Sequence, residues 1–394
     1  MKIVVTGLGM ISAAGKNAAE TLACFYAGRR NAGPVSLFSS EIKSPVYEVK
    51  EFSGKYFSER LRTLNLCLAA VEEALEDGGL TRKSLKGKRI GVAMGTTVGS
   101  ILNDLDFYRE YRAKGKASMD AVDRYLQGNL ASAVHSFLQT EGPSITVVNA
   151  CASGADAIGI AKSWLRAGLC DIAIAGGSDE MNYVPLCGFA SLGILSDSLC
   201  SPFDRDRTGL NLGEGAGVLL LENETGCRDR GGKVRAILRG YGTSNDAYHL
   251  TSPDPEGVGL DRAIRKALQE ANLETPEIAF INAHGTGTKD NDSVEGLVLH
   301  RLFGEKARFL STKGYTGHTL GAAGGLEAGF SILALEKGWI PESAGFTHRD
   351  PEIPLAPVAG RTPIQGRFAL STSLGFGGCD AALLLECPAG GGVS

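Results

Sequence analysis

The segment ITVVNACASGADAIGIAKSWLRAG, residues 145–168, follows the same plan as the segment ARFLSTKGYTGHTLGAAGGLEAGFSILALEKG, residues 307–338. Each has a short apolar run of strand length, then a turn of small residues, then a longer run with apolar residues at helical spacing. The apolar residues at this spacing are Ala155, Ile158, Ala161 and Leu165 in the first segment and Leu326, Phe330 and Leu333 in the second. Two strand–turn–helix units of one design therefore occur in one chain.

Other segments also occur twice and in the same order. The repeated strand-like runs are Lys2–Ser12 with Val234–Ser244, Arg89–Gly99 with Glu277–Thr288, and Ala216–Glu222 with Ala381–Glu386. Helical patterns cover Glu59–Asp77 and Gly259–Leu273. Strands separated by helices predict parallel sheets that are covered on both faces. We therefore predict an α/β protein made of two similar halves, residues 1–230 and 231–394, related by a pseudo-twofold axis.

The composition excludes several classes of partner. The 394 residues carry a formal net charge of −4, and 43% of them are hydrophobic. Such a chain can bury a large core, but its balanced charge provides no field that would attract nucleic acid or an anionic membrane surface. The N-terminal sequence MKIVVTGLGMIS predicts a first strand and not a signal peptide. No apolar run approaches the roughly 18–20 residues that cross a bilayer, so we expect neither a nucleic-acid nor a membrane partner.

The nine cysteines predict a reducing environment. They are scattered and odd in number, no pair forms a CxxC motif, and no Cys/His cluster has the spacing of zinc ligands. A chain of this length does not need disulfides, and free cysteines pack as small hydrophobic residues. We therefore expect a cytoplasmic protein with mostly buried thiols and no metal site.

Cys151 is the candidate nucleophile. It follows the apolar strand Ile145–Val148 and precedes Ala152-Ser153-Gly154, which begin a helix. This is the arrangement of a nucleophile elbow. A thiol at the start of a helix experiences the positive end of the helix dipole, which favours the thiolate. The alternative for Cys151 is a buried structural cysteine, which is the role we assign to the other eight.

Three polar side chains at strand ends and turns are further candidates. His284 closes a strand in NAHGTGT, residues 282–288, whose glycines allow a ligand to approach the backbone. Lys313 ends an apolar strand, where burial of its charge needs a task or a carboxylate partner, and Glu327 on the next helix is the candidate partner. His318 opens that helix, whose dipole favours a neutral imidazole. For each residue alone, a structural or solvent-exposed role is the alternative.

Internal symmetry connects these residues. The turn that carries Lys313 and His318 has the same place in the second half as the Cys151 turn has in the first. We therefore expect the two turns to face one cleft between the halves.

Taken together, these residues resemble the elongating β-ketoacyl-acyl carrier protein synthases, the KAS I/KAS II type of the thiolase superfamily. The resemblance covers essentially the whole chain, through the motifs VVTGLGM, NACASG, SPFDRDRTGLNLGEGAG, SNDAYHLTSP, NAHGTGT, STKGYTGHTLGAAG and SLGFGG. A His/Lys/His set around a cysteine is specific to this group, since initiating synthases have Cys-His-Asn and thiolases use a second cysteine. The resemblance implies a thiolase-like fold with two duplicated halves in a five-layered αβαβα arrangement.

The resemblance also implies a reaction and the residues that perform it. Cys151 would accept an acyl group from a carrier thioester, and the enolate formed by decarboxylation of a malonyl thioester would attack it. His284 and His318 would donate hydrogen bonds to the enolate oxygen, and Lys313 would order the site. The backbone N–H groups of Cys151 and Phe376 would form an oxyanion hole, with Phe376 also acting as a gate. The residues implied to bind the phosphopantetheine arm are Thr251, Ser252, Thr286 and Thr288; simple turn chemistry is their alternative role.

The implied partners are an acyl carrier protein and a second subunit. A homodimer is the default, and a heterodimer with a related ketosynthase-like chain is the alternative. The chemistry requires no metal or organic cofactor. The sequence departs from the family at Lys289-Asp290-Asn291-Asp292, where a proline is usual, and at Cys379-Asp380, where Thr-Asn is common. Such departures favour a specialised pathway for polyketides, aryl polyenes or unusual fatty acyl chains, with an acyl pocket that involves Val98–Phe107.

Two other functions compete with this one. A non-catalytic chain-length factor would share the fold but would lack the nucleophile, whereas Cys151 is present with His284, Lys313 and His318. A Cys–His acyl thioester hydrolase would need only Cys151 and one histidine, which leaves Lys313 without a task. Formation of a β-keto product separates the synthase from the hydrolase.

Overall fold

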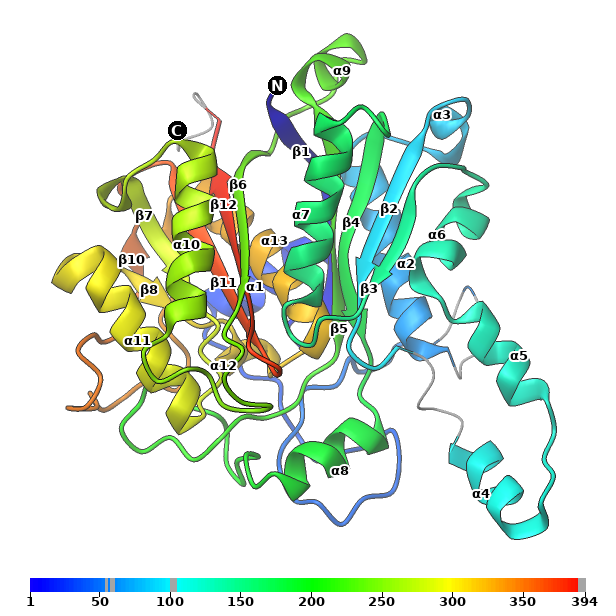
Figure 1. Ribbon diagram of the computed structural model, residues 1–394, viewed down its shortest axis with the longest axis horizontal. Coiled ribbons are helices and arrows are strands. Elements are labelled where there is room, and N and C mark those ends of the chain that lie inside the picture. Colours follow the sequence, from blue (N-terminus) through cyan, green and yellow to red (C-terminus); the bar gives the residue numbers. More distant parts are fainter. Residues whose placement is uncertain (54–55, 57–60, 100–104, 389–394) are drawn as a thin grey trace.

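The structure, a computed structural model, describes residues 1–53, 56, 61–99 and 105–388. Its centre is a sheet of ten strands in the order β3-β2-β4-β5-β1-β6-β12-β11-β7-β8 (Figure 1). The strands of the first half are β1 (Ile3–Ser12), β2 (Ile90–Gly95), β3 (Ser144–Val147), β4 (Ile172–Asp179) and β5 (Gly215–Asn223). Those of the second half are β6 (Ala236–Asn245), β7 (Ile278–Asn282), β8 (Phe309–Leu310), β11 (Phe368–Gly375) and β12 (Cys379–Glu386). A separate two-stranded sheet pairs β9 (Trp339–Ile340) with β10 (Thr362–Pro363).

The strand order shows the internal repeat that the sequence predicts. Read from the outer edge to the centre, the first half is β3-β2-β4-β5-β1 and the second is β8-β7-β11-β12-β6. Each strand thus has a counterpart at the same position of the other half. The two half-sheets meet where Val4 pairs with Ile237 and Val5 pairs with Ala236.

The prediction of parallel sheets was wrong for the inner strands. β2 runs parallel to β3 and β4, but β5 is antiparallel to both β4 and β1. In the second half β12 is antiparallel to β11 and β6. The loop between β11 and β12 has three residues, which is too short for a crossover and forces a hairpin.

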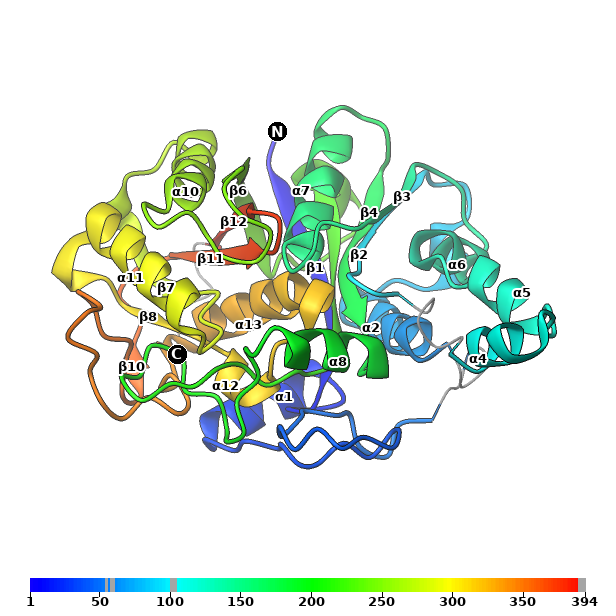
Figure 2. The same cartoon turned by 60° about the horizontal axis from the view of Figure 1, so that its bottom comes forward.

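Helices cover both faces of the two half-sheets (Figures 1 and 2). The α-helices are α1 (Ala18–Tyr26), α2 (Arg62–Asp77), α3 (Arg82–Leu85), α4 (Leu105–Lys114), α5 (Asp120–Gln127), α6 (Leu130–Leu138), α7 (Ser153–Arg166), α8 (Tyr183–Ser191), α9 (Glu224–Asp229), α10 (Val258–Ala271), α11 (Lys289–Phe303), α12 (Lys313–Thr316) and α13 (Ala323–Lys337). Short 3-10 helices are η2 (Thr275–Glu277), η3 (Gly304–Lys306) and η4 (Leu320–Ala322). The predicted helix from Glu59 begins outside the described residues, and its described part is α2.

The contacts between elements define the layers. Helix α2 packs on β1, β4 and β5, and α10 packs on β6 and β12. Helices α7 and α13 pack against each other between the half-sheets, α7 on β2 and β4 and α13 on β5 and β11. The order helix, sheet, helices, sheet, helix is the five-layered αβαβα arrangement that was predicted. In the described part of the chain, no helix has both the length and the hydropathy that crossing a bilayer requires.

Small residues let the two central helices approach each other. A Cβ placed on Gly324 of α13 would lie 2.4 Å from the backbone nitrogen of Ala155 in α7. One on Gly154 of α7 would lie 2.6 Å from the carbonyl oxygen of Gly321. Because both helices begin at this contact, the turns that precede them lie close together.

Candidate active site

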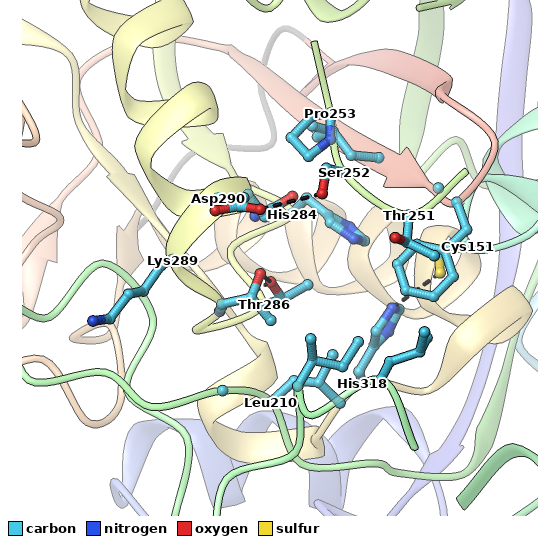
Figure 3. Close-up of a pocket in the computed structure, with 18 of the residues that line it drawn as sticks. Cys151, Leu210, Thr251, Ser252, Pro253, His284, Thr286, Lys289, Asp290 and His318 are labelled. Carbon is cyan, nitrogen blue, oxygen red and sulfur yellow. Dashed lines mark hydrogen bonds between the residues drawn. The ribbon is translucent and has the colours of Figure 1, made fainter. Parts of the chain in front are cut away.

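Residues from both halves line one cavity of about 420 Å³ (Figure 3). The predicted residues on its wall are Cys151, Thr251, Ser252, His284, Thr286, Thr288, His318 and Phe376. Lys313 and Glu327 are not on the wall but lie directly behind His284. The structure therefore brings together every site residue that the sequence predicts, including the two turns related by internal symmetry.

Cys151 sits on a tight turn between β3 and α7. Ala150 before it has a left-handed backbone, with φ of 47°, which is unusual for a residue with a side chain. The Ser153 hydroxyl stabilises the turn, since it donates to the Ala150 carbonyl at 2.6 Å and accepts from the Asn149 N–H at 2.8 Å. Helix α7 begins at Ser153, two residues after Cys151. This is the predicted nucleophile elbow, and it directs the Cys151 sulfur into the cavity.

His318 faces the Cys151 sulfur, with 3.0 Å between Nε2 and Sγ. It lies in the turn between α12 and η4 and not at the start of a helix as predicted. The Leu320 N–H donates to its Nδ1 at 3.3 Å, so the proton of the neutral ring belongs on Nε2. Burial and the charge of Lys313 lower the pKa of His318 well below its ordinary value. The neutral ring therefore presents an N–H donor to the cavity.

His284 at the end of β7 has a matching arrangement. Its Nδ1 lies 3.2 Å from the Lys313 ammonium, which can only donate, so the ring proton again belongs on Nε2. Burial, Lys313 and His318 lower the pKa of His284 well below its ordinary value. The two imidazole rings are nearly perpendicular, at 85°, with centroids 5.2 Å apart. The site thus contains two neutral imidazoles, both with Nε2–H as donor.

Lys313 and Glu327 form a buried ion pair. The side chains are 1% and 3% exposed, which excludes the alternative of a solvent-reaching lysine and confirms Glu327 as the carboxylate partner. Burial raises the pKa of Glu327 to about 7, and the Lys313 charge opposes that rise. The pair places one fixed ammonium behind the histidines, and its charge resists their protonation.

The Cys151 thiol is protonated in the closed site. Burial raises its pKa to about 12, while the charge of Lys313 and a hydrogen bond from the Phe376 N–H lower it. The helix dipole was expected to favour a thiolate, but this effect is smaller than the penalty for burying an unpaired charge. Thiolate formation therefore has to accompany the arrival of a substrate.

Phe376 lies at the tip of the β11–β12 hairpin, directly over the cysteine. Its ring stacks on Phe189 of α8, with centroids 5.5 Å apart and planes at 20°. Gly377 and Gly378 follow with φ of 81° and 74°, which glycine adopts readily. Phe189 also meets the His318 ring edge-on, at 6.5 Å. The sequence analysis missed Phe189, because a phenylalanine in an apolar helix carries no signal of a site.

Hydroxyl groups line the side of the cavity away from the cysteine. Thr286 Oγ1 and Thr288 Oγ1 are 2.8 Å apart, and the Ser252 hydroxyl donates to Asp290 at 3.2 Å. Figure 3 shows Thr286 and Ser252 on opposite sides of this region, with Lys289 extending away from Cys151. The arrangement offers a polar wall along which an amide-containing arm can lie.

Two buried carboxylates that the sequence analysis missed fix the catalytic turns. Glu295 of α11 accepts the backbone N–H groups of His284 and Gly285, both at 2.8 Å. Asp179 at the end of β4 accepts the N–H groups of Gly321 and Thr97, both at 2.7 Å. Burial raises the pKa of both carboxyl groups. A single acidic residue after a strand or in a helix is too common a pattern to reveal this role.

The prediction that no metal site exists rests on the spacing of Cys and His residues along the sequence, but the fold brings residues together that are far apart in the sequence. One donor atom each of Cys151, His284 and His318 lie within 4.8 Å of one another, as do those of Asp204, Asp206 and His348 in a second group among the described residues. A thiolate and two imidazoles suit a soft cation such as zinc. The Lys313 ammonium beside His284 repels such a cation, so the charge of the site favours an anionic ligand.

Comparisons with known proteins agree with this geometry. Residues 1–226 match the family model "Beta-ketoacyl synthase, N-terminal domain", and residues 235–347 match "Beta-ketoacyl synthase, C-terminal domain". A 3-oxoacyl-[acyl-carrier-protein] synthase 2 of Synechocystis sp. is 34% identical over 408 residues, which cover 98% of each chain.

Two solved structures share the fold over almost the full length. The ishigamide ketosynthase/chain length factor has a TM-score of 0.93 and 33% identity, and the match covers 98% of this chain and 99% of that one. A type II polyketide ketosynthase in complex with its acyl-carrier protein bound to the hexaketide has a TM-score of 0.89 and 26% identity, with the same coverage.

Proposed function

The chain belongs to the β-ketoacyl synthase family, and on this premise we propose that Cys151 carries the acyl group while His284 and His318 activate the malonyl thioester. The enzyme is a 3-oxoacyl-[acyl-carrier-protein] synthase, an acyltransferase that joins an acyl thioester to malonyl-ACP with loss of CO₂. Both substrates arrive on the carrier protein, so the condensation needs no separate cofactor. A catalytic chain of this kind is distinct from the chain-length factor that the sequence left as an alternative.

In the first half-reaction, Cys151 takes the acyl group from the carrier. Sγ forms a bond to the thioester carbonyl carbon, the bond from that carbon to the pantetheine sulfur breaks, and the Cys151 proton ends on the departing sulfur. The Phe376 N–H, which already contacts Sγ, supports the oxyanion of the tetrahedral intermediate together with the Cys151 N–H. No net proton acceptor is needed, which suits a thiol whose pKa is raised.

In the second half-reaction, malonyl-ACP occupies the position that the first carrier arm has left. Both Nε2–H groups point at the thioester carbonyl oxygen, where charge develops when the carboxylate leaves as CO₂. The resulting enolate carbon attacks the acyl-Cys151 carbonyl, and the bond from that carbon to Sγ breaks as the new carbon–carbon bond forms. The Cys151 sulfur leaves as a thiolate, which takes up a proton from water and restores the thiol. Lys313 keeps both imidazoles neutral and orders His284, and Glu327 holds Lys313.

The polar wall of the cavity supports a role in binding the carrier arm. Thr251, Ser252, Thr286 and Thr288 lie on the same cavity as the sulfur, and their hydroxyl groups can meet the amides of phosphopantetheine. Their place on the wall of the cavity that contains Cys151 argues against simple turn chemistry as their only role.

One observation carries this proposal: a thiol and two imidazole N–H donors from opposite halves converge within 4.8 Å. The test incubates the enzyme with acyl-ACP and then with malonyl-ACP, followed by mass spectrometry of the intact protein and product. We expect an acyl adduct on Cys151 and a β-keto product, and loss of both in C151A. The buried C67A variant is the control, because Cys67 is fully buried in the core away from the cavity. Hydrolysis without a β-keto product would support the acyl hydrolase and refute the synthase assignment.

We further propose that the chain forms a homodimer through β3, or pairs there with a related chain. Strand β3 is the last strand at its edge of the sheet and has two exposed apolar side chains beside it, Ile145 and Val148. Helices α4 and α5 project beyond this edge in both views, and α4 carries the exposed Tyr108 and Tyr111 (Figures 1 and 2). An exposed edge strand with apolar neighbours is a template for pairing with a second subunit.

The pathway and the compartment are part of the proposal as well. The matched ketosynthases of the ishigamide and hexaketide systems make a specialised chain product our first hypothesis, and fatty acid synthesis the second. A panel of acyl carriers that differ in length and unsaturation, scored by acylation of Cys151, decides between them. The expected acyl-pocket segment Val98–Phe107 includes residues outside those described.

All nine cysteines are free, which supports a location in the reducing cytoplasm. We also keep the proposed division of the chain into two halves, residues 1–230 and 231–394.

A further inference from the structure

Two carboxyl groups, Asp246 and Asp380, join the Phe376 hairpin to the loop that follows β6. Asp380 is the second residue of β12 and is in register with Leu374 of β11 and Ser244 of β6. Asp246 follows the last residue of β6. Both residues line the cavity that contains Cys151. The pair therefore lies where the β11–β12 hairpin meets the loop that follows β6.

The backbone shows how closely the hairpin and this loop are joined. The Asp246 N–H donates to the Gly378 carbonyl at 2.8 Å, and the Gly377 N–H donates to the Leu250 carbonyl at the same distance. The Asn245 amide adds a third bond, to the Gly377 carbonyl, at 2.8 Å. Movement of the hairpin tip as one body away from this loop would therefore break this set of contacts.

Two backbone N–H groups hold the carboxyl group of Asp246 in place. Its carboxylate accepts the N–H of Asp254 at 3.0 Å and the N–H of Gly259 at 3.1 Å. Gly259 belongs to the first turn of α10, so this hydrogen bond joins the loop after β6 to the start of that helix.

The environment of Asp380 favours its protonated form. The side chain is 2% exposed, and within the described residues no donor reaches its Oδ2 atom. Oδ2 of Asp380 and Oδ1 of Asp246 converge above Gly259, where a Cβ would come within 2.2 and 2.3 Å of them. Burial, the charge of Asp246 and a hydrogen bond with it, together with the charges of Glu295 on α11 and of Asp254, raise the pKa of Asp380 to about 8. A hydrogen bond between two carboxyl groups requires a proton on one of them.

We propose that Asp380 is a positioning residue whose protonated carboxyl group donates to Asp246 and holds the Phe376 hairpin closed over Cys151, and that loss of this proton releases the hairpin. The inference rests on the proposed role of the Phe376 N–H in the oxyanion hole. With the proton present, the pair fixes the distance between β12 and the loop after β6. With the proton lost, the buried carboxylate of Asp380 and the half-buried carboxylate of Asp246 repel each other and the hairpin moves away.

The direction of the pH effect follows from these charges. Asp380 keeps its proton through neutral pH and loses it as the pH rises through about 8. Acyl transfer to Cys151 should therefore decline on the alkaline side, because the Phe376 donor no longer faces the sulfur. Deprotonation of the Cys151 thiol at high pH has the opposite effect on the rate, because a thiolate attacks the thioester faster than a thiol does. The test therefore has to separate the two effects.

The experiment compares full-length wild type, D380N and D380A. The asparagine amide can donate to Asp246 at every pH, so D380N keeps the contact without the titration. The rate of acyl transfer from acyl-ACP to Cys151 is measured from about pH 6.5 to about pH 9.5 by rapid quench and mass spectrometry, and each protein is normalised to its own rate at about pH 7. We expect the ratio of wild type to D380N to fall roughly tenfold by about pH 9, one unit above the midpoint. Titration of Cys151 is common to both proteins and cancels in the ratio.

Two further readouts distinguish this inference from the proposed function. The infrared difference spectrum of wild type minus D380N should show the C=O band of a protonated carboxylic acid at about pH 7 and lose it at about pH 9.5; the subtraction removes the contribution of Glu327, whose pKa is also raised. Acyl transfer to Cys151 should be slower in D380A than in D380N at every pH, and the ratio of the two rates should not fall at alkaline pH. Superimposed wild-type and D380N rate profiles, or no such band in the difference spectrum, would overturn the inference. Failure of wild type to form any adduct would overturn the proposed function, and the infrared band would still test the carboxyl pair.

Discussion

Cys151 and His318 are separated by 167 residues in the sequence and by 3.0 Å between Sγ and Nε2 in space. The chemistry of this site depends on which ring nitrogen of each histidine carries the proton, and neighbouring groups determine this position. The Leu320 N–H and the Lys313 ammonium occupy the Nδ1 atoms of His318 and His284, which leaves both Nε2–H groups for the substrate. Lys313 thus acts through the two imidazoles, and Glu327 acts through Lys313.

At this scale, we predict that removing only one partner of the Lys313–Glu327 pair destabilises the protein, whereas removing both charges together does so much less. E327A leaves a buried ammonium without a counter-charge, and the free energy of unfolding should fall by about 3–5 kcal/mol. The double variant K313M/E327L removes both charges and should recover most of that loss. Urea denaturation monitored by circular dichroism measures both.

The matched control is the exposed ion pair between Lys2 and Glu224, 3.5 Å apart. E224A should change the free energy of unfolding by at most about 1 kcal/mol, because solvent screens exposed pairs. Equal losses in E327A and E224A would contradict the assignment of a buried, unscreened pair.

At the scale of elements, the close approach of α7 and α13 positions the two catalytic turns. The helices begin where Gly154 and Gly324 face each other's backbone, with no room for a Cβ. The turn before α7 carries Cys151, and the segment before α13 carries Lys313 and His318. The glycines thus determine how close the nucleophile and the imidazoles come.

We predict that G324A separates these helices and lowers stability. The new Cβ would lie 2.4 Å from the Ala155 nitrogen, and backbone atoms cannot move aside as a side-chain tip can. The free energy of unfolding should fall by about 1–3 kcal/mol, and acyl transfer should fall with it. Urea midpoints and the rate of Cys151 acylation are the measurements.

Gly188 in α8 provides the control, since a Cβ there meets nothing within 4 Å. G188A should leave stability unchanged or raise it by about 0.5–1 kcal/mol, because alanine suits a helix better than glycine. A G324A protein as stable as G188A would show that the helices can separate without loss.

At the scale of the whole molecule, the two ends of the sheet differ. The backbone of β8 at one edge is covered, since the Val358 N–H donates to the Phe309 carbonyl at 2.9 Å. At the other edge β3 has the exposed apolar residues Ile145 and Val148. An assembly through β3 would continue the sheet into a second subunit and would leave β8 at the outer ends.

We predict that I145K converts a dimer to a monomer in sedimentation velocity, because an edge lysine blocks strand pairing. L297K is the control, since Leu297 is 38% exposed on α11 and Ile145 is 39% exposed; Figure 1 shows α11 near the opposite edge of the sheet. L297K should stay dimeric. A wild-type protein that sediments as a monomer, or an unaffected I145K, would contradict assembly through this edge.

Much of the site could be predicted because its residues stand in local motifs. Strand ends and turns around Cys151, His284 and His318 have recognisable spacing, and the duplication placed the two turns opposite each other. Phe189, Glu295, Asp179 and the Asp246–Asp380 pair have no such spacing. Only the three-dimensional structure reveals their roles, because a single carboxylate or phenylalanine has the same local sequence pattern in a core, in a helix cap or in a functional site.

The amino-acid sequence alone determined the α/β class, the two repeated halves, the elbow at Cys151 and the family of the chain, because hydrophobic period and turn chemistry act over a few neighbouring residues. Only the tertiary structure decided which strands run antiparallel, which nitrogen of each histidine is free to face the substrate, and which carboxyl groups lie side by side. These properties depend on contacts between residues that are far apart in the chain, and no local pattern encodes such contacts.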